Sequence, residues 1–551
     1  MKRPKSERVE LSIEALEAIL EQARTAPLSE TQIGQLQGVL NTLGRLTQEL
    51  EKKRTSLYRL RNLLFGPQTE KTEDILKQKK QKQNDTLKTG VSGQEKQKKP
   101  KGHGRNGADA YLGAKRIQVS HGSLKSGNPC PETGCTGKVY RRSDPGVIVR
   151  IQGLPPLPAT VYELEKLRCN LCGKVFTAKA PEGIGEEKYD ATAVSMIGCL
   201  KYGAGFPFHR LEKLEKHLGI PLPATTQWDL VNGAAERIQP VYHAIIDEAA
   251  QGELLHNDDT PMKILELMAE NQTLASCKNA SKRTGLFTSG IISKCGDHLM
   301  ALFFTGRHHA GENLQAVLDK RSKALSAPIQ MSDALSRNLP GEFETILANC
   351  LSHGRRRFVD VVENFPEEVR YVLEILAKVY KNDAVARRES LSPQDHLIFH
   401  QQESKPLMQQ LHEWFERQFE EKRVEPNSGL GEAITYMLNH WQALTLFLHK
   451  PGAPLDNNIC ERALKKAILH RKNALFYKTQ NGARVGDIFM TLIHTAELAG
   501  ANAFDYLCEL QRHAGLLKEN PKQWMPWNYR ETLQRMTAGG NGQAPERSPP
   551  K

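Results

Sequence analysis

The feature that most constrains this fold is a run of β-type segments that begins near residue 253. Three strand patterns come first, then a helical segment (NLQAVLD) and a fourth strand pattern. In chain order the four are LLHNDDT, GLFTSGIIS, DHLMALFFT and APIQMSD. Successive strands followed by alternating helix and strand are typical of a mixed sheet. We therefore expect an α/β domain built around a mixed sheet.

Most of the remaining chain has a helical pattern. Within residues 190–250, the segment HRLEKLEKHLGIPLPATTQWDLV predicts two helices joined by a Gly-Ile-Pro turn. Such a pair resembles a helix-turn-helix, whose second helix reads the DNA major groove, although helix pairs with short turns occur in any helical domain. Residues 356–450 are nearly all helical by pattern. Another helix begins near Asp456, which could be its N-cap, and helical pattern continues to about residue 516.

The N-terminal residues 11–65 predict a helix with a leucine every seventh position. The repeat comprises Leu36, Leu43, Leu50, Leu57 and Leu64, with Val39, Leu46 and Leu60 at interleaved positions. A stripe of this kind is typical of a short coiled coil, and a lone helix that carries it needs a partner. We expect a homodimer or higher homo-oligomer; the alternative is one helix that packs on its own domain. Residues 66–110 are rich in Lys, Gln, Gly and Thr and predict a flexible basic linker.

The charge of the chain favours a polyanionic partner. Lys and Arg number 76 against 63 Asp and Glu, for a formal net charge of +13. Nucleic acid is the usual partner of such an excess, although many basic proteins bind nothing specific. No segment approaches the roughly 20 apolar residues that span a bilayer. The opening MKRPKSERVELS lacks the apolar core of a signal peptide. We therefore expect a cytoplasmic, nucleoid-associated protein with no membrane partner.

Four of the ten cysteines form two close pairs, Cys130 with Cys135 and Cys169 with Cys172. Zinc prefers four soft ligands in a tetrahedron, and each pair can supply one edge of it. The short β-type runs around these pairs provide little core, so a metal would stabilise the segment. The alternatives are disulfides, which a reducing cytosol disfavours, and unrelated buried thiols. We predict one structural zinc.

Three acidic residues are candidates for phosphodiester chemistry. Asp258 lies in the strand LLHNDDT, Asp333 closes the strand APIQMSD, and Glu461 lies one turn into the helix that begins near Asp456. Two-metal catalysis needs several carboxylates on rigid elements that converge on one point. Acidic residues at strand ends and on helices are more often simply solvated. The pattern alone therefore provides candidates for a metal site.

Six blocks of the chain, in order, resemble transposases of the insertion-sequence-66 family, a branch of the DDE recombinases. Besides the cysteine pairs, they are RLRNLLFGPQTEK at 59–71, LLHNDDTPM, NCLSHGRRRF at 349–358, PLDNNICERALKKAILHRKNALF at 454–476 and MPWN at 525–528. The resemblance covers nearly the whole chain. It implies an RNase H-like catalytic core with a large helical insertion.

The resemblance implies that Asp258, Asp333 and Glu461 hold two magnesium (or manganese) ions. Many members have Asp-Gly where this chain has Asp333-Ala334, and Asp-Glu where it has Asp258-Asp259. Because alternate residues of a strand face opposite sides, only one of Asp258 and Asp259 can face the metals, and we favour Asp258. The implied reaction is hydrolysis at each transposon end, followed by attack of the freed 3′-hydroxyl on target DNA. The partners are then double-stranded DNA, as terminal repeats and as target, and possibly accessory transposition proteins.

Several basic residues are candidates for DNA phosphate contact. They are Arg355, Arg356, Lys465, Lys466, Arg471 and Lys472. Lys465 lies four residues after Glu461, so both share one face of the helix. For any one of these residues, an ordinary solvated basic surface is about as good an interpretation. His353 could neighbour DNA or metal, and a structural role fits it equally well.

These observations divide the chain into eight segments. They are a coiled-coil or dimerisation segment (1–65), a basic linker (66–114), a zinc-finger-like segment (115–185), a helix-turn-helix-like segment (186–250), the first part of the core (251–355), a helical insertion (356–450), the second part of the core (451–516) and a C-terminal segment with a disordered tail (517–551). Two other functions compete with a transposase. One is a zinc-containing DNA-binding protein with an inactive core, and the other is a metal nuclease without strand transfer.

Overall fold

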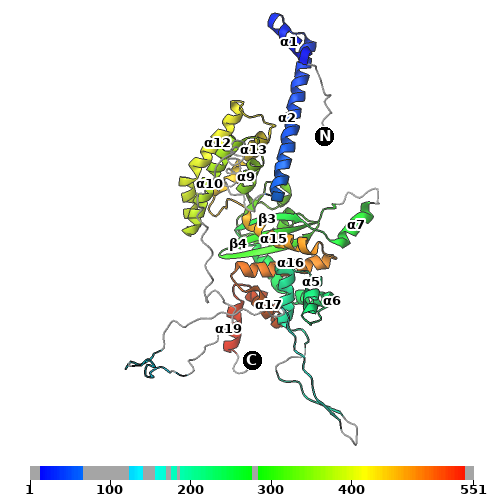
Figure 1. Cartoon of the computed structure of the whole chain (residues 1–551), viewed down its shortest axis with the longest axis vertical. Helices are drawn as coiled ribbons and strands as arrows, with labels where there is room; N and C mark the ends of the chain where they lie inside the picture. The colour runs from blue at the N-terminus through cyan, green and yellow to red at the C-terminus, as the bar shows by residue number, and fades with distance from the viewer. Residues whose placement is uncertain are drawn as a thin grey trace. The chain divides into compact units, whose positions relative to one another are not determined.

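The computed structural model describes most of the 551 residues (Figure 1). The described residues are 13–65, 123, 125–133, 135–140, 156–168, 175–182, 187–275 and 283–539. They fall into two compact units, one within residues 84–158 and the other within residues 1–83 and 159–551. The whole predicted basic linker (66–114) lies outside the described residues, as does the predicted disordered tail after Gly539.

A mixed five-stranded sheet forms the α/β core of the larger unit. Its strands are β3 (Leu254–Pro261), β4 (Phe287–Cys295), β5 (His298–Gly306), β6 (Ile329–Ser332) and β7 (Ile346–Asn349). Their order is β5-β4-β3-β6-β7, with β3 antiparallel to β4, β4 antiparallel to β5, and β6 parallel to both β3 and β7. The prediction of a mixed sheet is confirmed. The fifth strand was not predicted, because ILAN is too short for a strand pattern to stand out.

The outer edge of β5 is closed by α16 (Gln480–Leu498). An edge strand leaves every second backbone N–H unpaired, which favours aggregation unless something covers it. Here the amides of Ala301, Phe303 and Thr305 donate to side chains of Thr495, Thr491 and Asp487, at 3.1, 3.1 and 2.7 Å. Two residues along a strand span about 6.6 Å and four along a helix about 6 Å, so the two rows stay in step.

The segment before the sheet consists of helices, as the sequence predicts. These are α4 (Ala191–Gly198), the π-helical turn η2 (Cys199–Gly203), α5 (Phe208–His217) and α6 (Ala224–Ala249). The short segment 218–223 joins α5 to α6 and begins with Leu218 and Gly219, the latter at φ +81°. The predicted helix pair is therefore present. One face of α6, with Val231, Ile238 and Ile245, is fully buried.

The helices between β7 and residue 457 form a group (Figure 1) with a hydrophobic core of its own. They are α9 (Leu351–Asp360), α10 (Pro366–Arg388), α11 (Pro393–Glu403), α12 (Lys405–Glu420), α13 (Gly429–Asn439), α14 (Trp441–Leu444) and the 3-10 turn η4 (Leu446–Leu448). Phe358, Leu373, Phe415 and Ile434 lie fully buried at the centre of this cluster. The chain thus leaves the sheet after β7, builds a helical group, and returns.

The chain returns through α15 (Asn458–Ala474), which packs on β3 and β4. The residue before its first helical position is Asn457, not the expected N-cap Asp456. Asp456 lies one residue earlier, and its carboxylate accepts from the backbone N–H of Asn458 at 3.1 Å. Further described helical elements of this unit are α7 (Leu265–Ala275), α8 (Ala310–Leu318), η3 (Ser336–Asn338), α17 (Ala503–Arg512), α18 (Ala514–Leu517), η5 (Pro521–Trp524) and α19 (Tyr529–Gly539).

The predicted N-terminal helix is divided in two. The helices are α1 (Ile13–Thr25) and α2 (Glu30–Phe65), and Pro27 lies in the break between them. A proline removes a backbone donor and clashes with the preceding turn, which accounts for the break. On α2 the heptad leucines Leu43, Leu50 and Leu57 are 59, 61 and 66% exposed. The stripe is thus available for a partner, and the coiled coil stays a prediction. Among the described helices, none is long and apolar enough to cross a membrane.

Candidate active site

The sheet brings Asp258 and Asp333 to the same level on neighbouring strands. β3 runs parallel to β6, and the last paired residues are His256 and Met331. Asp258 and Asp333 each lie two residues beyond that pair. Because parallel strands advance at the same rate, the two aspartates come level where β6 ends. Two residues that are 75 positions apart in sequence thereby become neighbours at one end of the sheet.

Helix α15 places Glu461 over the same point. Its first turn is tied to β3 by the buried Asn457, whose Nδ2 donates to the carbonyl of Asn257 at 3.1 Å. Cys460 Sγ donates to the carbonyl of Gly290 at 3.3 Å, and Gly290 is the residue of β4 that pairs with Asp258. A Cβ on Gly290 would lie 3.0 Å from the Leu464 side chain, so glycine permits the close approach of the helix. Glu461, next to Cys460, is thus held near Asp258.

The electrostatics of Asp258 reflect how close the three carboxyl groups are. Burial, together with the charges of Asp333, Asp259 and Glu461, raises the pKa of Asp258 to about 7, against the hydrogen bond from the Asp259 amide. That bond joins the Asp259 N–H to Asp258 Oδ1 at 2.8 Å. A cluster of like-charged carboxylates that perturbs the pKa of one of its members is typical of functional sites. Such a donor set, all hard oxygen atoms, fits a divalent cation of the magnesium type.

The neighbouring Asp259 faces away from this group and is already paired. Its Oδ2 lies 2.8 Å from His309 Nδ1, and its Oδ1 lies 3.6 Å from a guanidinium nitrogen of Arg337. The Asp259 side chain is only 1% exposed. Because alternate residues of a strand face opposite sides, Asp259 pairs with basic residues, whereas Asp258 lies near other carboxylates. This geometry favours Asp258 over Asp259 as the candidate ligand.

Asp333 is held by the turn that follows β6. Its Oδ1 accepts a hydrogen bond from the Leu335 amide at 3.3 Å and a second one from Asn338 Nδ2. The carbonyl of Asn338 accepts in turn from Asn257 Nδ2 and from Gln330 Nε2, both at 2.7 Å. These buried amides connect the turn to β3 and β6. Nothing in the local sequence pattern marked them, because their partners are 8 and 81 positions away.

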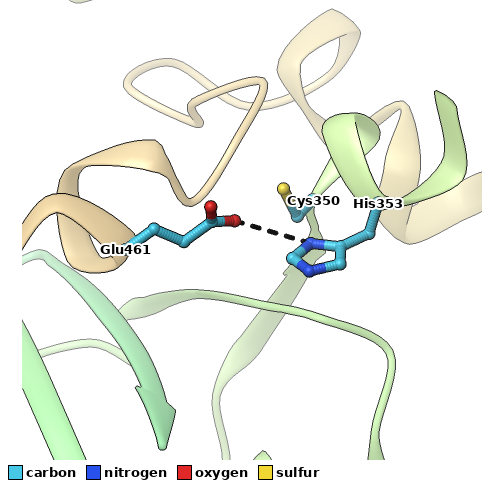
Figure 2. A group of neighbouring side chains, drawn as sticks. All are labelled: Cys350, His353 and Glu461. Carbon is cyan, nitrogen blue, oxygen red and sulfur yellow. Dashed lines mark ion pairs between the residues drawn. The ribbon is translucent and has the colours of Figure 1, made fainter. Parts of the chain in front are cut away.

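Glu461 also has neighbours from the start of α9 (Figure 2). Oε1 of Glu461 lies 3.8 Å from His353 Nδ1, and Figure 2 shows the imidazole and the carboxylate facing each other beside Cys350. One ligand atom of each of the three residues lies within 4.8 Å of the other two. Cys350 is fully buried and its Sγ accepts from the Asn457 amide at 3.3 Å. We therefore interpret Cys350 as part of the core and His353 as the polar neighbour of Glu461.

The six basic candidates fall into two groups. Two of them have strong contacts within the protein: the ammonium of Lys466 lies 2.8 Å from Glu497, and Arg471 donates to Thr260 Oγ1 at 3.1 Å and to the carbonyl of Pro261. The other four are exposed or half-buried on α9 and α15, namely Arg355, Arg356, Lys465 and Lys472. The structure thus gives Lys466 and Arg471 a role in holding the fold, whatever else they contact.

A further basic residue packs against Tyr436, which neighbours Asp333, and was not among the candidates. The guanidinium of Arg357 lies 3.9 Å from the ring centre of Tyr436 on α13. Burial raises the pKa of the Tyr436 hydroxyl, Arg357 lowers it, and the charge of Asp333 raises it. Tyr436 therefore lies in the neighbourhood of Asp333, and Arg357 packs on the Tyr436 ring. The run Arg355–Arg357 carried the signal, but only packing shows which member lies here.

The zinc prediction is only half within the described residues. Cys130 donates its backbone N–H to the Gly137 carbonyl at 2.8 Å, in a turn closed by an antiparallel bridge between Pro129 and Lys138. Hydrogen bonds from the Gly137 amide and from Cys130 lower the pKa of the Cys135 thiol. Cys169 and Cys172 lie outside the described residues. Around them, Lys166–Arg168 (β1) and Val175–Thr177 (β2) pair antiparallel.

The comparison with protein families identifies one family for this chain. The model of the "Transposase IS66 family" matches residues 187–485, which hold the sheet, the helical group and α15. Three relatives come from Sinorhizobium fredii (strain NBRC 101917 / NGR234), and all are named as uncharacterized proteins. The protein y4jD is 34% identical over 72% of this chain and 77% of its own length. The protein y4hP is 27% identical over 66% of this chain and 67% of its own length. The protein y4qI is 24% identical over 61% of this chain and 62% of its own length.

Proposed function

The chain belongs to the IS66 family of transposases, and from that premise we propose that it cuts and joins DNA with Asp258, Asp333 and Glu461 as its catalytic carboxylates. The reaction would be hydrolysis of a phosphodiester at each end of an insertion element, followed by transfer of the freed 3′-hydroxyl to target DNA. The observation that carries this proposal is the convergence of the three carboxyl groups, on β3, after β6 and on α15. Burial, with the charges of Asp333 and Glu461 among its neighbours, raises the pKa of Asp258 to about 7.

The sheet supports an RNase H-like core. Three antiparallel strands (β5, β4, β3) are extended by two parallel ones (β6, β7), and the carboxylates lie on the central strand, after its parallel neighbour and on a helix across the sheet. The helical group between β7 and α15 then corresponds to the predicted insertion. Since it has its own core, it can interrupt the catalytic fold without disturbing the sheet.

Asp258, Asp333 and Glu461 would hold two magnesium or manganese ions. When bound, these cations supply the Lewis acidity that activates an attacking oxygen and stabilises a leaving one. The three residues fit such ions, because the charges of Asp333 and Glu461 disfavour ionisation of Asp258, and a cation would relieve this repulsion. In the absence of cations, Asp258 would keep its proton up to about neutral pH and release it as the site is filled.

The remaining side chains of the site would position the reactants. His353, 3.8 Å from Glu461, would orient that carboxylate. The exposed Lys465 lies one turn further along the same helix face and would contact a DNA phosphate near the site. Arg357, which packs on Tyr436, would do the same. Electrostatic contacts of this kind position the backbone without reading sequence.

Other segments would deliver DNA to the site. We infer that the α5–α6 pair acts as a helix-turn-helix for the element ends, and that the two cysteine pairs bind one structural zinc. The exposed leucines of α2 would form a homodimer, which would bring two element ends together.

The experiment compares the full-length protein with Asp258→Asn on DNA that carries the element ends, with magnesium and then with calcium. We expect the parent to cleave with magnesium and the variant to bind DNA without cleaving it. Asp297→Asn, an exposed aspartate in the turn between β4 and β5 of the same sheet, is the matched control and should cleave normally. A parent that binds but never cleaves would indicate a DNA-binding protein with an inactive core.

A second assay uses pre-cut ends and a target plasmid. A transposase joins the ends to the plasmid, whereas a nuclease without strand transfer leaves them free. Joined products that require Asp258 would support the full proposal, and cleavage without joining would limit the function to that of a metal nuclease.

A further inference from the structure

A second group of potential metal ligands lies in the helical group, on elements other than those of the carboxylate site. It consists of Asp383 on α10 with His396 and His400 on α11. The two histidines are four residues apart, so they lie on one face of their helix, and Asp383 meets them from the neighbouring helix. Asp383 and His400 are almost fully buried, with side chains 7 and 2% exposed, and His396 is 26% exposed.

The distances match those between ligands of one metal ion. Asp383 Oδ1 lies 3.2 Å from His396 Nε2 and 3.5 Å from His400 Nε2. Tetrahedral zinc binds nitrogen and oxygen at about 2.0–2.1 Å, which puts neighbouring ligands about 3.3 Å apart. None of these three atoms has a hydrogen bond of good geometry, although each is buried. Asp383 Oδ1 is within ion-pair distance of both imidazoles, but buried polar atoms without a well-formed hydrogen bond are rare, and they point here to a ligand that the three atoms share.

The surroundings of the group are those of a built site. His400 Nδ1 lies 2.9 Å from Ser404 Oγ, which fixes the ring and leaves Nε2 for a metal. Asp383 Oδ2 lies 2.7 Å from the guanidinium of Arg387, so this oxygen is oriented and Oδ1 is left over. The partial exposure of His396 provides an entry path for an ion. Metal-binding histidines and carboxylates in proteins have second partners of this kind.

We propose that Asp383, His396 and His400 bind a divalent transition metal, with zinc as the ion that the donor set fits best. Two imidazoles and one carboxylate are a common zinc set, and a water molecule would complete the tetrahedron. The ion would link α10 to α11. Gln401 on α11 donates to the carbonyl of Leu448 at 3.1 Å. By fixing α11, the ion would therefore also stabilise the segment that leads into α15. This inference is independent of the proposed catalytic function.

The test counts zinc bound to the full-length protein after chelation, dialysis and reloading with zinc alone. His396→Gln should bind one equivalent of zinc less than the parent. The amount of zinc bound by cysteines would be the same in both proteins. The matched control is His412→Gln. His412 Nδ1 lies 3.2 Å from Glu416, and the His412 side chain is 32% exposed. Among the described residues, no third potential ligand forms a group with these two. This variant should bind as much zinc as the parent. Equal zinc in the parent and His396→Gln would overturn the proposal.

A measurement on the parent alone covers the case in which His396→Gln does not fold. Diethyl pyrocarbonate modifies accessible imidazole nitrogens, and mass spectrometry identifies the modified residues. Zinc should protect His396 from modification and leave His412 reactive. Modification of His396 to the same extent with and without zinc would refute the site.

Discussion

The raised pKa of Asp258 makes a quantitative prediction about stability. Moving the pKa of an aspartate from its ordinary 3.8 to about 7 corresponds to about 4 kcal/mol between the two protonation states. The pKa of Asp258 is higher in the folded protein than in the unfolded one. The stabilisation that comes from this difference is therefore fully present below pH 4. The free energy of unfolding then falls progressively as the pH rises to about 7, and above that pH it stays constant. An amide in place of the Asp258 carboxyl group would have no charge to bury. Asp258→Asn should therefore be more stable than the parent above pH 7, by up to about 4 kcal/mol.

Urea unfolding of the magnesium-free proteins at pH 5 and pH 8 measures this difference. The advantage of Asp258→Asn should be larger at pH 8 than at pH 5, and magnesium at pH 8 should reduce it by stabilising the parent. Asp297→Asn, whose carboxylate is exposed, should show no such dependence. If Asp258→Asn were equal to or less stable than the parent at pH 8 without magnesium, the carboxylate would not be buried among like charges and our reasoning would be wrong.

Three further substitutions test the arrangement around the site. Asp259→Asn should destabilise the protein by about 1–3 kcal/mol in thermal or urea unfolding, because a buried carboxylate partner of His309 is lost; an unchanged midpoint would contradict the pairing. Gly290→Ala should crowd Leu464, displace α15 and reduce cleavage more than DNA binding, whereas unchanged cleavage would show that the approach is not tight. Thr491→Val should leave an edge amide of β5 without its acceptor and lower the free energy of unfolding by about 1–3 kcal/mol, with no effect expected on metal binding.

The sequence predicted the elements of the core better than their arrangement. Four strands and the helix that carries Glu461 have clear local patterns, and all are present. The strand β7 was missed, because four residues are too few to show a period. The break between α1 and α2 was missed as well, although Pro27 marks it. Local patterns report what a segment forms, whereas the order of strands depends on contacts between distant segments.

The candidate site shows the same limit. Alternation along the strand separated Asp258 from Asp259, since that property is local. The partners of Asp259 could not be predicted, because His309 is 50 positions away and reaches it only through the fold. The ion pair of Lys466 with Glu497 on another helix could not be predicted for the same reason, and the DNA contact of Lys466 stays a prediction.

The central claim is that three carboxylates, distant in sequence, together hold divalent cations. The most direct test counts manganese ions bound to the full-length protein by electron paramagnetic resonance, in the parent and in Asp258→Asn, Asp333→Asn and Glu461→Gln. We predict that each of the three variants binds fewer ions than the parent, while Asp297→Asn binds as many. Equal manganese binding by the parent and all three variants would contradict the account.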